Sequence, residues 1–329
     1  MTFSLPEPPL FSRSTVDRGG EFRGNHGAAQ QAWEEAKVLL LDGRGRFRVA
    51  TEGGLHWVSG PEAGDGPPPD AVLLGVDGET FYWARRVDEL DEPLGDARSA
   101  GHHLSGDDAG LLVTALGMLN WNDNAGFSPT TGEPTAVEKF GWVRRDRSCG
   151  REEFPRTDPA IITVVHDGGD HILLGRQAMW PERWYSTLAG FVEPGESLEQ
   201  CVIREVYEEV GITVADPQYL GSQPWPFPRS LMLGFAALGD PEEPLRFLDG
   251  EIADAQWFTR DQVRDALVAK EWTDPEGGDD APAAPLRLPG SVSIARAMIE
   301  AWAAAPPPAN RRVGGDFRRV GGEFRRVGG

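Results

Sequence analysis

The segment from Gly190 to Ile212 constrains this chain most, because it joins a glycine-containing loop to an acidic, amphipathic stretch. Two glycines of the loop, Gly190 and Gly195, permit a tight backbone path that other residues resist. Ser197, followed three residues later by Gln200, forms the capping-box pattern that opens a helix. The segment therefore predicts a loop followed at once by a helix.

Three glutamates share one face of this predicted helix, which we place at Leu198–Val210. Glu205, Glu208 and Glu209 are spaced i, i+3 and i+4, so they fall within an arc of about 100°. A neighbouring apolar arc, expected to pack on a sheet, comprises Val202, Ile203, Val206 and Val210. Like charges at this spacing cost roughly 0.2–0.5 kcal/mol per pair. Mg²⁺ or Mn²⁺ would offset this cost, since both prefer carboxylate oxygens and also coordinate phosphate. The alternative is an ordinary acidic surface helix.

The same segment resembles the Nudix box, Gly-x5-Glu-x7-Arg-Glu-U-x-Glu-Glu-x-Gly-U, in which U is apolar. The matching residues are Gly190, Glu196, Arg204, Glu205, Val206, Glu208, Glu209, Gly211 and Ile212. In Nudix hydrolases this loop and helix hold metals that activate water for attack on a diphosphate. The resemblance implies that Glu205, Glu209 and the Ala189 carbonyl are metal ligands. It also implies that Glu208 ligates or orients water, and that Arg204 braces the loop through Glu196.

A proline-rich stretch downstream, Ser222–Ser230, points to the substrate. Its prolines fix a rigid, extended path that presents two aromatic rings, although a purely structural connection would look the same. The stretch resembles the signature of NADH pyrophosphatases within the Nudix family. This implies hydrolysis of NADH or NAD to AMP and nicotinamide mononucleotide, and removal of NAD caps from RNA 5′ ends. The implied substrate-binding residues are Ser222, Gln223, Pro224, Trp225, Pro226, Phe227, Pro228, Arg229 and Ser230.

Four further positions match the same family. Glu251 resembles its additional metal-binding, catalytic glutamate outside the box. Phe154 and Phe191 stand where aromatic residues contact the ligand, and Ala295 matches a substrate-contacting alanine. The resemblance covers roughly Leu111 to Ala304.

The hydropathy pattern predicts an α+β protein, in which a smaller α+β domain and a connector precede a mixed β-sheet with helices packed on it. The family resemblance implies that this last part has the Nudix fold, a mixed β-sheet sandwiched by helices. The expected parts are an N-terminal domain at 1–121, a degenerate zinc-ribbon connector at 122–156, a Nudix domain at 157–305 and a disordered Arg/Gly-rich tail at 306–329. Expected helices include Ala28–Val38, a buried face at Leu111–Leu119, Arg260–Lys270 and Val292–Ala304.

The connector departs from the family pattern. Many relatives carry four zinc-binding cysteines there, whereas this chain has Ser128, Thr131, Asp146 and Cys149. Hydroxyls are poor zinc ligands, so no structural zinc is expected. We expect aromatic packing to replace it, around Phe127, Phe140 and Trp142. In this respect the chain resembles actinobacterial NADH pyrophosphatases that lack the ribbon cysteines.

Composition limits the remaining possibilities. A net charge of -20 disfavours a non-specific nucleic-acid binder. Cys149 and Cys201 give no disulfide framework, which favours the reducing cytoplasm. No signal-peptide pattern or run of about 18 apolar residues occurs, so a protein without a membrane span is expected. The family resemblance implies a homodimer.

Three alternatives stay open on the sequence alone. One is a Nudix hydrolase of another nucleoside diphosphate derivative, such as ADP-ribose or a dinucleoside polyphosphate. Another is a non-catalytic nucleotide sensor, which usually loses box carboxylates that are all present here. The third is an RNA-binding protein acting through the Arg/Gly-rich tail.

Overall fold

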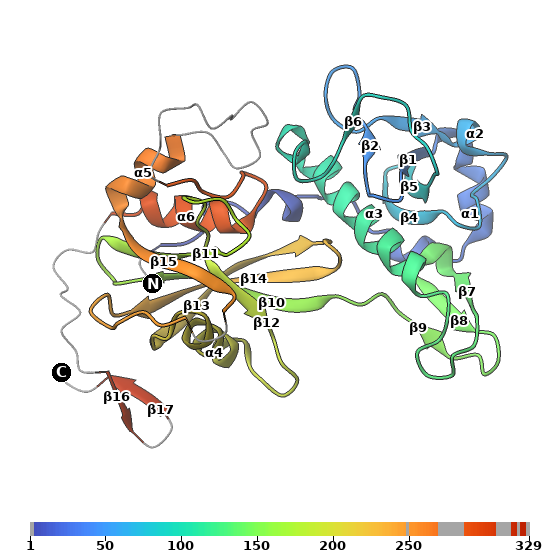
Figure 1. Cartoon of the computed structure of the whole chain (residues 1–329). Coiled ribbons are helices and arrows are strands. Elements are labelled where there is room, and N and C mark those ends of the chain that lie inside the picture. Colours follow the sequence, from blue (N-terminus) through green and yellow to red (C-terminus); the bar gives the residue numbers. More distant parts are fainter. Residues whose placement is uncertain (1–2, 248–249, 269–285, 307–316, 321–322, 327–329) are drawn as a thin grey trace. The chain divides into compact units, whose positions relative to one another are not determined.

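The computed structural model describes residues 3–247, 250–268 and 286–306, and the backbone of 317–320 and 323–326. The chain divides into two compact units (Figure 1). The N-terminal unit comprises Leu10–Asp158 and Pro224–Leu231, and the C-terminal unit comprises Met1–Pro9, Pro159–Gln223 and Met232–Gly329. The main change of unit, at Asp158, lies close to the boundary expected at residue 157.

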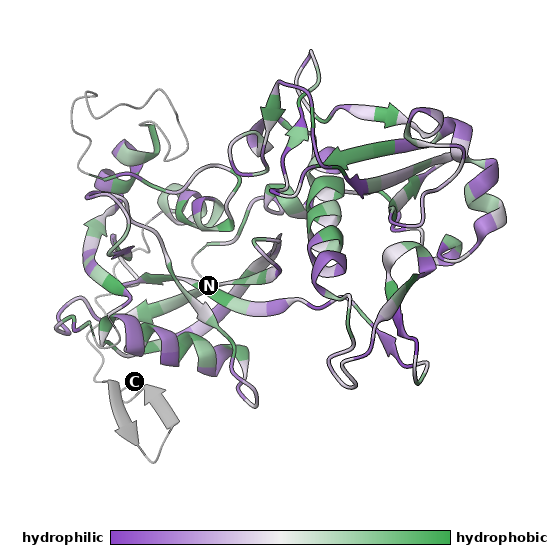
Figure 2. Cartoon of the chain, turned by 45° about the vertical axis from the view of Figure 1, so that its right-hand side comes forward, coloured by the Kyte–Doolittle hydropathy of each residue, from purple (hydrophilic) through white to green (hydrophobic). Residues whose placement is uncertain are grey.

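The N-terminal unit is built on one sheet and one long helix. Its elements are η1 (Leu10–Ser12), η2 (Gly20–Phe22), α1 (His26–Gln31), η3 (Trp33–Glu35), β1 (Lys37–Leu41), β2 (Phe47–Arg48), β3 (Trp57–Ser59), α2 (Gly60–Ala63), β4 (Val72–Asp77), β5 (Thr80–Arg86), β6 (Leu94–Gly95), η4 (Gly101–His103), α3 (Gly106–Asn124), β7 (Thr135–Glu138), η5 (Lys139–Gly141), β8 (Val143–Asp146) and β9 (Glu152–Glu153). The sheet has the order β4-β5-β1-β2-β6, with β3 also paired to β1. Helix α3 packs on β4 and β5 and is hydrophobic along most of its length (Figure 2). This position explains why the Leu111–Leu119 stripe is buried.

The first predicted helix, around Ala28–Val38, is shorter than expected. Helix α1 ends at Gln31, and β1 begins at Lys37. Within β1, Val38 pairs with Val58 on one side and with the parallel strand β5 on the other, and its side chain is fully buried. Because this apolar run gains both ladder hydrogen bonds and core packing, the sheet prevails over helix continuation.

The connector is a three-stranded sheet, β7-β8-β9, inside the N-terminal unit. Asp146 is fully buried, and it is hydrogen-bonded to Thr131 and Cys149, two other residues at the expected zinc-ribbon positions. Its carboxylate accepts hydrogen bonds from the Thr131 hydroxyl, the Ser148 hydroxyl (2.6 Å), and the backbone N–H groups of Ser148 (2.8 Å) and Cys149 (3.2 Å). These bonds hold the pKa of Asp146 well below its usual range. A hydrogen-bonded carboxylate thus organises this turn.

The aromatic packing expected to replace zinc is realised only in part. Phe127 is 66% exposed, so the prediction is wrong for this ring. Phe140 packs edge-on against Trp83 at 5.0 Å between ring centroids. Trp142 donates its indole N–H to a backbone carbonyl, and the Arg23 guanidinium stacks 3.4 Å from its ring centroid. In the connector, hydrogen bonds to Asp146 are present where packing of the Phe127 ring was expected.

Asp146→Ala is expected to lower the melting temperature by several degrees, because it leaves four donors without their acceptor. The folded pKa of Asp146 is depressed, so its contribution is present above the unfolded value and lost as pH falls. The difference between wild type and variant should therefore be full at neutral pH and shrink below about pH 4. Thermal scans across that range, with the exposed Asp91→Ala as control, measure it. A difference that does not change with pH would contradict this account.

The C-terminal part of the chain forms a sheet with helices on both faces, as predicted. Its elements are β10 (Asp158–His166), β11 (His171–Gln177), β12 (Leu188–Phe191), α4 (Leu198–Val210), β13 (Val214–Trp225), β14 (Ser230–Gly239), β15 (Ile252–Thr259), α5 (Arg260–Val268), α6 (Ile294–Ala304), β16 (Phe317–Val320) and β17 (Glu323–Arg326). The main sheet has the order β13-β14-β10-β11-β15, and β12 pairs with β10. Along β10, Ile161 and Val165 pack with α4, whereas Ile162 and Val164 pack with α5 and α6. This alternation places α4 on one face and the last two helices on the other (Figure 1).

The predicted tail contains regular structure. Strands β16 and β17 form an antiparallel pair, which departs from the expected disorder for these residues. A Gly-Gly dipeptide separates the two runs in the sequence, a pattern that favours a hairpin. The rest of the tail from residue 307, and residues 269–270 of the helix expected at 260–270, lie outside the described residues. None of the described helices is long and apolar enough to cross a membrane.

Candidate functional site

The loop and helix of the Gly190–Ile212 segment form as predicted, and α4 has the expected limits. Ser197 and Gln200 make reciprocal hydrogen bonds of 3.2 and 2.9 Å between side chain and backbone, which confirms the capping box. The helix ends at Gly211, whose φ of 75° is left-handed. The apolar arc packs against the sheet, through Val202, Ile203, Val206 and Val210. Packing of that arc fixes the direction in which the glutamates point.

Gly190 lets the Glu205 carboxyl group approach the backbone of β12. Within the sheet, Gly190 of β12 pairs with Ile161 of β10. A Cβ atom at this position would lie 1.8 Å from the Glu205 carboxyl carbon, so no side chain fits. The first glycine of the segment therefore makes a cradle for the first of the three helix glutamates.

The Arg204 guanidinium joins the loop to the acidic face of the helix. Its Nε and Nη2 donate to the two carboxylate oxygens of Glu196, each at 2.8 Å. Its Nη1 donates to Glu205 at 2.8 Å and to Glu208 at 2.9 Å, and Nη2 also reaches the Phe191 carbonyl at 2.9 Å. These bonds hold the pKa of Glu196 at about 2 and raise that of Arg204. The expected bracing of the loop through Glu196 is present in the structure.

The acidic groups around Glu205 repel one another. Burial raises the pKa of Glu205, and the charges of Glu208 and Glu251 raise it further, although Arg204 opposes them. Glu251 immediately precedes β15 and is exposed, and its charge still contributes to the raised pKa of Glu205. Glu209 is only 3% exposed, so a carboxyl group is buried on the same helix. Arg204 therefore pairs with Glu196, Glu205 and Glu208, and further acidic groups lie on or near the same helix.

The donor set suits a hard divalent cation. It consists of carboxylate oxygens around a cradle that excludes a Cβ atom, and such oxygens are the ligands that Mg²⁺ and Mn²⁺ prefer. Among the described side chains, no group of three or more His, Cys, Asp or Glu is close enough together to hold a metal ion. Glu205 and Glu208 are instead turned toward Arg204.

A polar cluster that no sequence motif predicted is centred on Asp254, three residues after Glu251 in the sequence. The Tyr185 hydroxyl donates to Asp254 on β15, and Gln256 donates to both at 2.9 and 2.8 Å. The register of β11 with β15 also shifts here, because Asp254 pairs with Arg176 whereas Ile252 pairs with the next residue of β11. Such bulges re-aim neighbouring side chains. No sequence motif marks these residues, since the contact joins positions about seventy residues apart.

The substrate signature Ser222–Ser230 is split by the structure between the two units. Gln223 belongs to the C-terminal unit and is fully buried. Its amide donates to the Val292 carbonyl at 2.7 Å and accepts from the Ile294 N–H at 2.6 Å. Ala295, another predicted contact residue, is 2% exposed. Both side chains are placed in the core and are not presented to a ligand.

The second part of the signature, Pro224–Ser230, belongs to the N-terminal unit and is here called the signature tip. The Trp225 ring, half-buried, lies 6.0 Å from Phe11 and 5.0 Å from Phe227 between centroids. The Arg98 guanidinium lies 4.3 Å from the Phe227 centroid. From α3, the Asn120 amide donates to the carbonyls of two signature prolines, Pro226 and Pro228, at 3.1 Å. The tip is therefore held in place by several contacts, while Pro228, Arg229 and part of Trp225 stay accessible.

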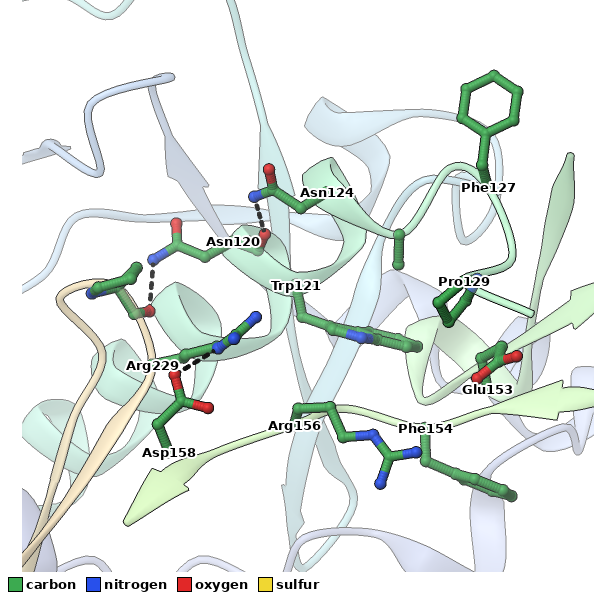
Figure 3. A pocket seen from close by; sticks show the side chains of 12 residues that line it. Asn120, Trp121, Asn124, Phe127, Pro129, Glu153, Phe154, Arg156, Asp158 and Arg229 are labelled. Carbon is green, nitrogen blue, oxygen red and sulfur yellow. Dashed lines mark hydrogen bonds and ion pairs between the residues drawn. The ribbon is translucent and has the colours of Figure 1, made fainter. Parts of the chain in front are cut away.

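Phe154 lines a cavity of about 610 Å³ in the N-terminal unit, here called the aromatic pocket (Figure 3). The ring is 47% exposed, and Trp121 and Phe127 also line the cavity. Arg229 of the signature lines it as well and pairs with Asp158 at 2.8 Å. The pocket was not foreseen, because its wall combines α3, the connector and the signature tip.

The two remaining predicted residues lie on β12 in the C-terminal unit. Phe191 is 59% exposed at the end of the strand, so its ring is available to a ligand. Ala189 pairs with Ile162 one residue before the Gly190 cradle. β12 therefore brings an accessible aromatic ring and the predicted carbonyl next to the acidic helix.

A family model described as the NUDIX domain matches residues 156–276. The chain is 50% identical over 310 residues to the NAD-capped RNA hydrolase NudC of Mycobacterium bovis, covering 92% of this chain and 97% of that protein. The protein of the same name from Mycobacterium tuberculosis is 49% identical over the same shares. The human NAD-capped RNA hydrolase NUDT12 is 39% identical over 207 residues, or 59% of this chain and 42% of that protein.

Proposed function

Since this chain belongs to the Nudix family, in one group with the mycobacterial NAD-capped RNA hydrolases NudC, we propose that it hydrolyses the diphosphate of NADH or NAD. The products are AMP and nicotinamide mononucleotide. Under the same proposal it removes NAD caps from RNA 5′ ends. The observation that carries the proposal is the Glu205 carboxylate in the Gly190 cradle, facing Arg204 among further acidic groups.

The proposal assigns a divalent cation, Mg²⁺ or Mn²⁺, to Glu205, Glu209, Glu251 and the Ala189 carbonyl. Such a cation supplies positive charge against the diphosphate and makes water a better nucleophile. The chain's own residues prepare for it. Glu209 places a carboxyl group away from solvent, and the cradle fixes where Glu205 lies.

Arg204 and Glu208 have different tasks in this proposal. Arg204 is a positioning residue, because its fork holds Glu196 of the loop and leaves one nitrogen for the helix carboxylates. Glu208 pairs with Arg204 at 2.9 Å, and 47% of its side chain is accessible, so water can reach its carboxylate. It is the group best placed to accept a proton from the attacking water.

Substrate selection is assigned to exposed rings and to the signature tip. Phe191 and Phe154 offer stacking surfaces, and Trp225 and Arg229 remain partly accessible on the tip. Gln223 and Ala295 act indirectly in this proposal, since both are buried. We further propose that the enzyme acts in the cytoplasm and that it forms a homodimer. The molar mass from light scattering tests the oligomeric state.

The deciding experiment compares hydrolysis of NADH, NAD, ADP-ribose and NAD-capped RNA by the full chain with Mg²⁺, with Mn²⁺ and with a chelator. Metal-dependent release of AMP and nicotinamide mononucleotide, with NADH or NAD preferred over ADP-ribose, is expected. Preference for ADP-ribose would favour the alternative diphosphate hydrolase. Binding without turnover on every substrate would favour the nucleotide sensor.

The purified protein is expected to contain no stoichiometric zinc. Three of the four ribbon positions carry oxygen side chains, and the Asp146 carboxylate already accepts four hydrogen bonds from this turn. Elemental analysis after dialysis measures the metal content. About one zinc per chain would overturn the expectation.

A further inference from the structure

The N-terminal unit contains a second cavity, of about 240 Å³, whose charged lining consists only of arginines. Arg18, Arg156 and Arg229 contribute to it, and we call it the arginine pocket. Thr114 and Trp142 also line it, beside apolar side chains and signature prolines. A cavity lined by cations is unexpected in a chain with a net charge of -20.

These arginines are incompletely neutralised. Arg18 donates to a neutral group, the Thr114 hydroxyl, at 3.0 Å. Arg156 makes no hydrogen bond or ion pair with any described residue, and only Arg229 has a carboxylate partner, Asp158. Burial lowers the pKa of the adjacent Arg23, and the charge of Arg18 lowers it further. An anion is the ligand that would satisfy this group.

The arginine pocket and the aromatic pocket share two residues, Arg156 and Arg229. On the aromatic side, Phe127 is 66% exposed. Figure 3 shows the Arg156 side chain in the same cavity as the Trp121 indole. Proteins bind single-stranded nucleic acids by combining cationic side chains, which contact the phosphate backbone, with aromatic rings, on which the bases stack.

We propose that the arginine pocket binds phosphates of single-stranded RNA, with an unpaired base of the same strand in the aromatic pocket. This inference rests on the proposed function, since the RNA would be the transcript that carries the cap. Arginine suits the task because its fork binds phosphate oxygens in pairs and stays charged. Because the chain as a whole has a net charge of -20, we expect RNA binding to depend on local groups of cations such as these arginines.

Two cavities joined through shared arginines suit consecutive nucleotides better than one mononucleotide, which would occupy only one of them. A free mononucleotide offers the same phosphate chemistry, so the experiment must separate the two sources. Arg156 is the residue to change. It is exposed and makes no contact that the fold needs.

The test measures binding of a labelled, uncapped single-stranded RNA to the full chain by fluorescence anisotropy at several salt concentrations. Arg156→Ala is expected to weaken binding several-fold and to reduce the slope of log K against log salt by about 0.7, the value for one phosphate of a single strand. Arg156→Lys should keep the slope. The matched control is Arg151→Ala, an exposed arginine outside both pockets that bonds only the Thr130 hydroxyl.

A second readout compares kcat/KM for NAD-capped RNA and for NAD. The loss caused by Arg156→Ala should be larger on the capped RNA than on NAD. Equal losses on both substrates, an equal effect of Arg151→Ala, or complete displacement of the RNA by AMP would each overturn the proposal. Unchanged RNA binding by Arg156→Ala would also overturn it and place the RNA elsewhere, for instance on the Arg/Gly-rich tail. If wild type hydrolyses no dinucleotide, the proposed function fails, and the anisotropy arms still decide whether this surface binds RNA.

Discussion

Glu209→Gln is expected to abolish turnover while the fold stays intact. Glu209 is 3% exposed on α4, and the change keeps its shape while replacing the carboxylate that we propose as a metal ligand. Loss of an outer-shell partner of a metal ligand costs roughly 10–100-fold, so loss of the ligand itself should cost more. The measurement is kcat/KM for NADH over a range of Mg²⁺ and Mn²⁺ concentrations.

Stability distinguishes this explanation from simple damage to the helix. Without metal, Glu209→Gln relieves repulsion on the acidic face, so the variant should melt no lower than wild type. Adding Mn²⁺ should raise the melting temperature of wild type more than that of the variant, because a bound ligand stabilises the folded state. Glu199→Gln, on an exposed position of the same helix, is the matched control and should keep both responses. Activity within a few fold of wild type at saturating metal would refute the assignment.

The part of the site that could be predicted from sequence is the part determined locally. The limits of α4 follow from a capping box at one end and a left-handed glycine at the other, signals that act over three or four residues. The buried arc of α4 follows from helical spacing alone. The bracing of Glu196 by Arg204 was expected from the family resemblance and not from helical spacing.

What could not be predicted depends on contacts between distant residues. Tyr185 and Asp254 meet only because their segments lie on either side of β11. The Asp146 turn is held by hydrogen bonds whose geometry is not visible in residue types. The end of α1 was misjudged because helix propensity is local, whereas the pairing of β1 with β5 is not.

The signature stretch Ser222–Ser230 could be recognised from local sequence, but its packing depends on contacts with distant residues. Alanine substitutions at two of its residues should therefore have different effects on stability and specificity. Gln223→Ala removes the partner of two backbone groups, the Val292 carbonyl and the Ile294 N–H, inside the core. Each buried group left unsatisfied costs about 1–3 kcal/mol, so the melting temperature should fall by several degrees. Because the lesion is structural, NADH and ADP-ribose should lose kcat/KM alike. Gln218→Ala, whose amide bonds only the nearby Asp216, is the control and should change little.

Trp225→Ala should instead change specificity. Part of its ring packs on Phe11 and Phe227, and part remains accessible on the signature tip. Catalytic carboxylates act on the diphosphate shared by all substrates, so only groups outside them distinguish what the diphosphate carries. A lost aromatic contact is worth ~0.5–1.5 kcal/mol, hence a loss of up to about tenfold in preference for NADH over ADP-ribose is expected. The measurement is kcat/KM for both substrates beside the melting temperature of each variant. If Trp225→Ala lowers stability and reduces both substrates equally, as expected for Gln223→Ala, the whole signature serves packing and specificity must reside elsewhere.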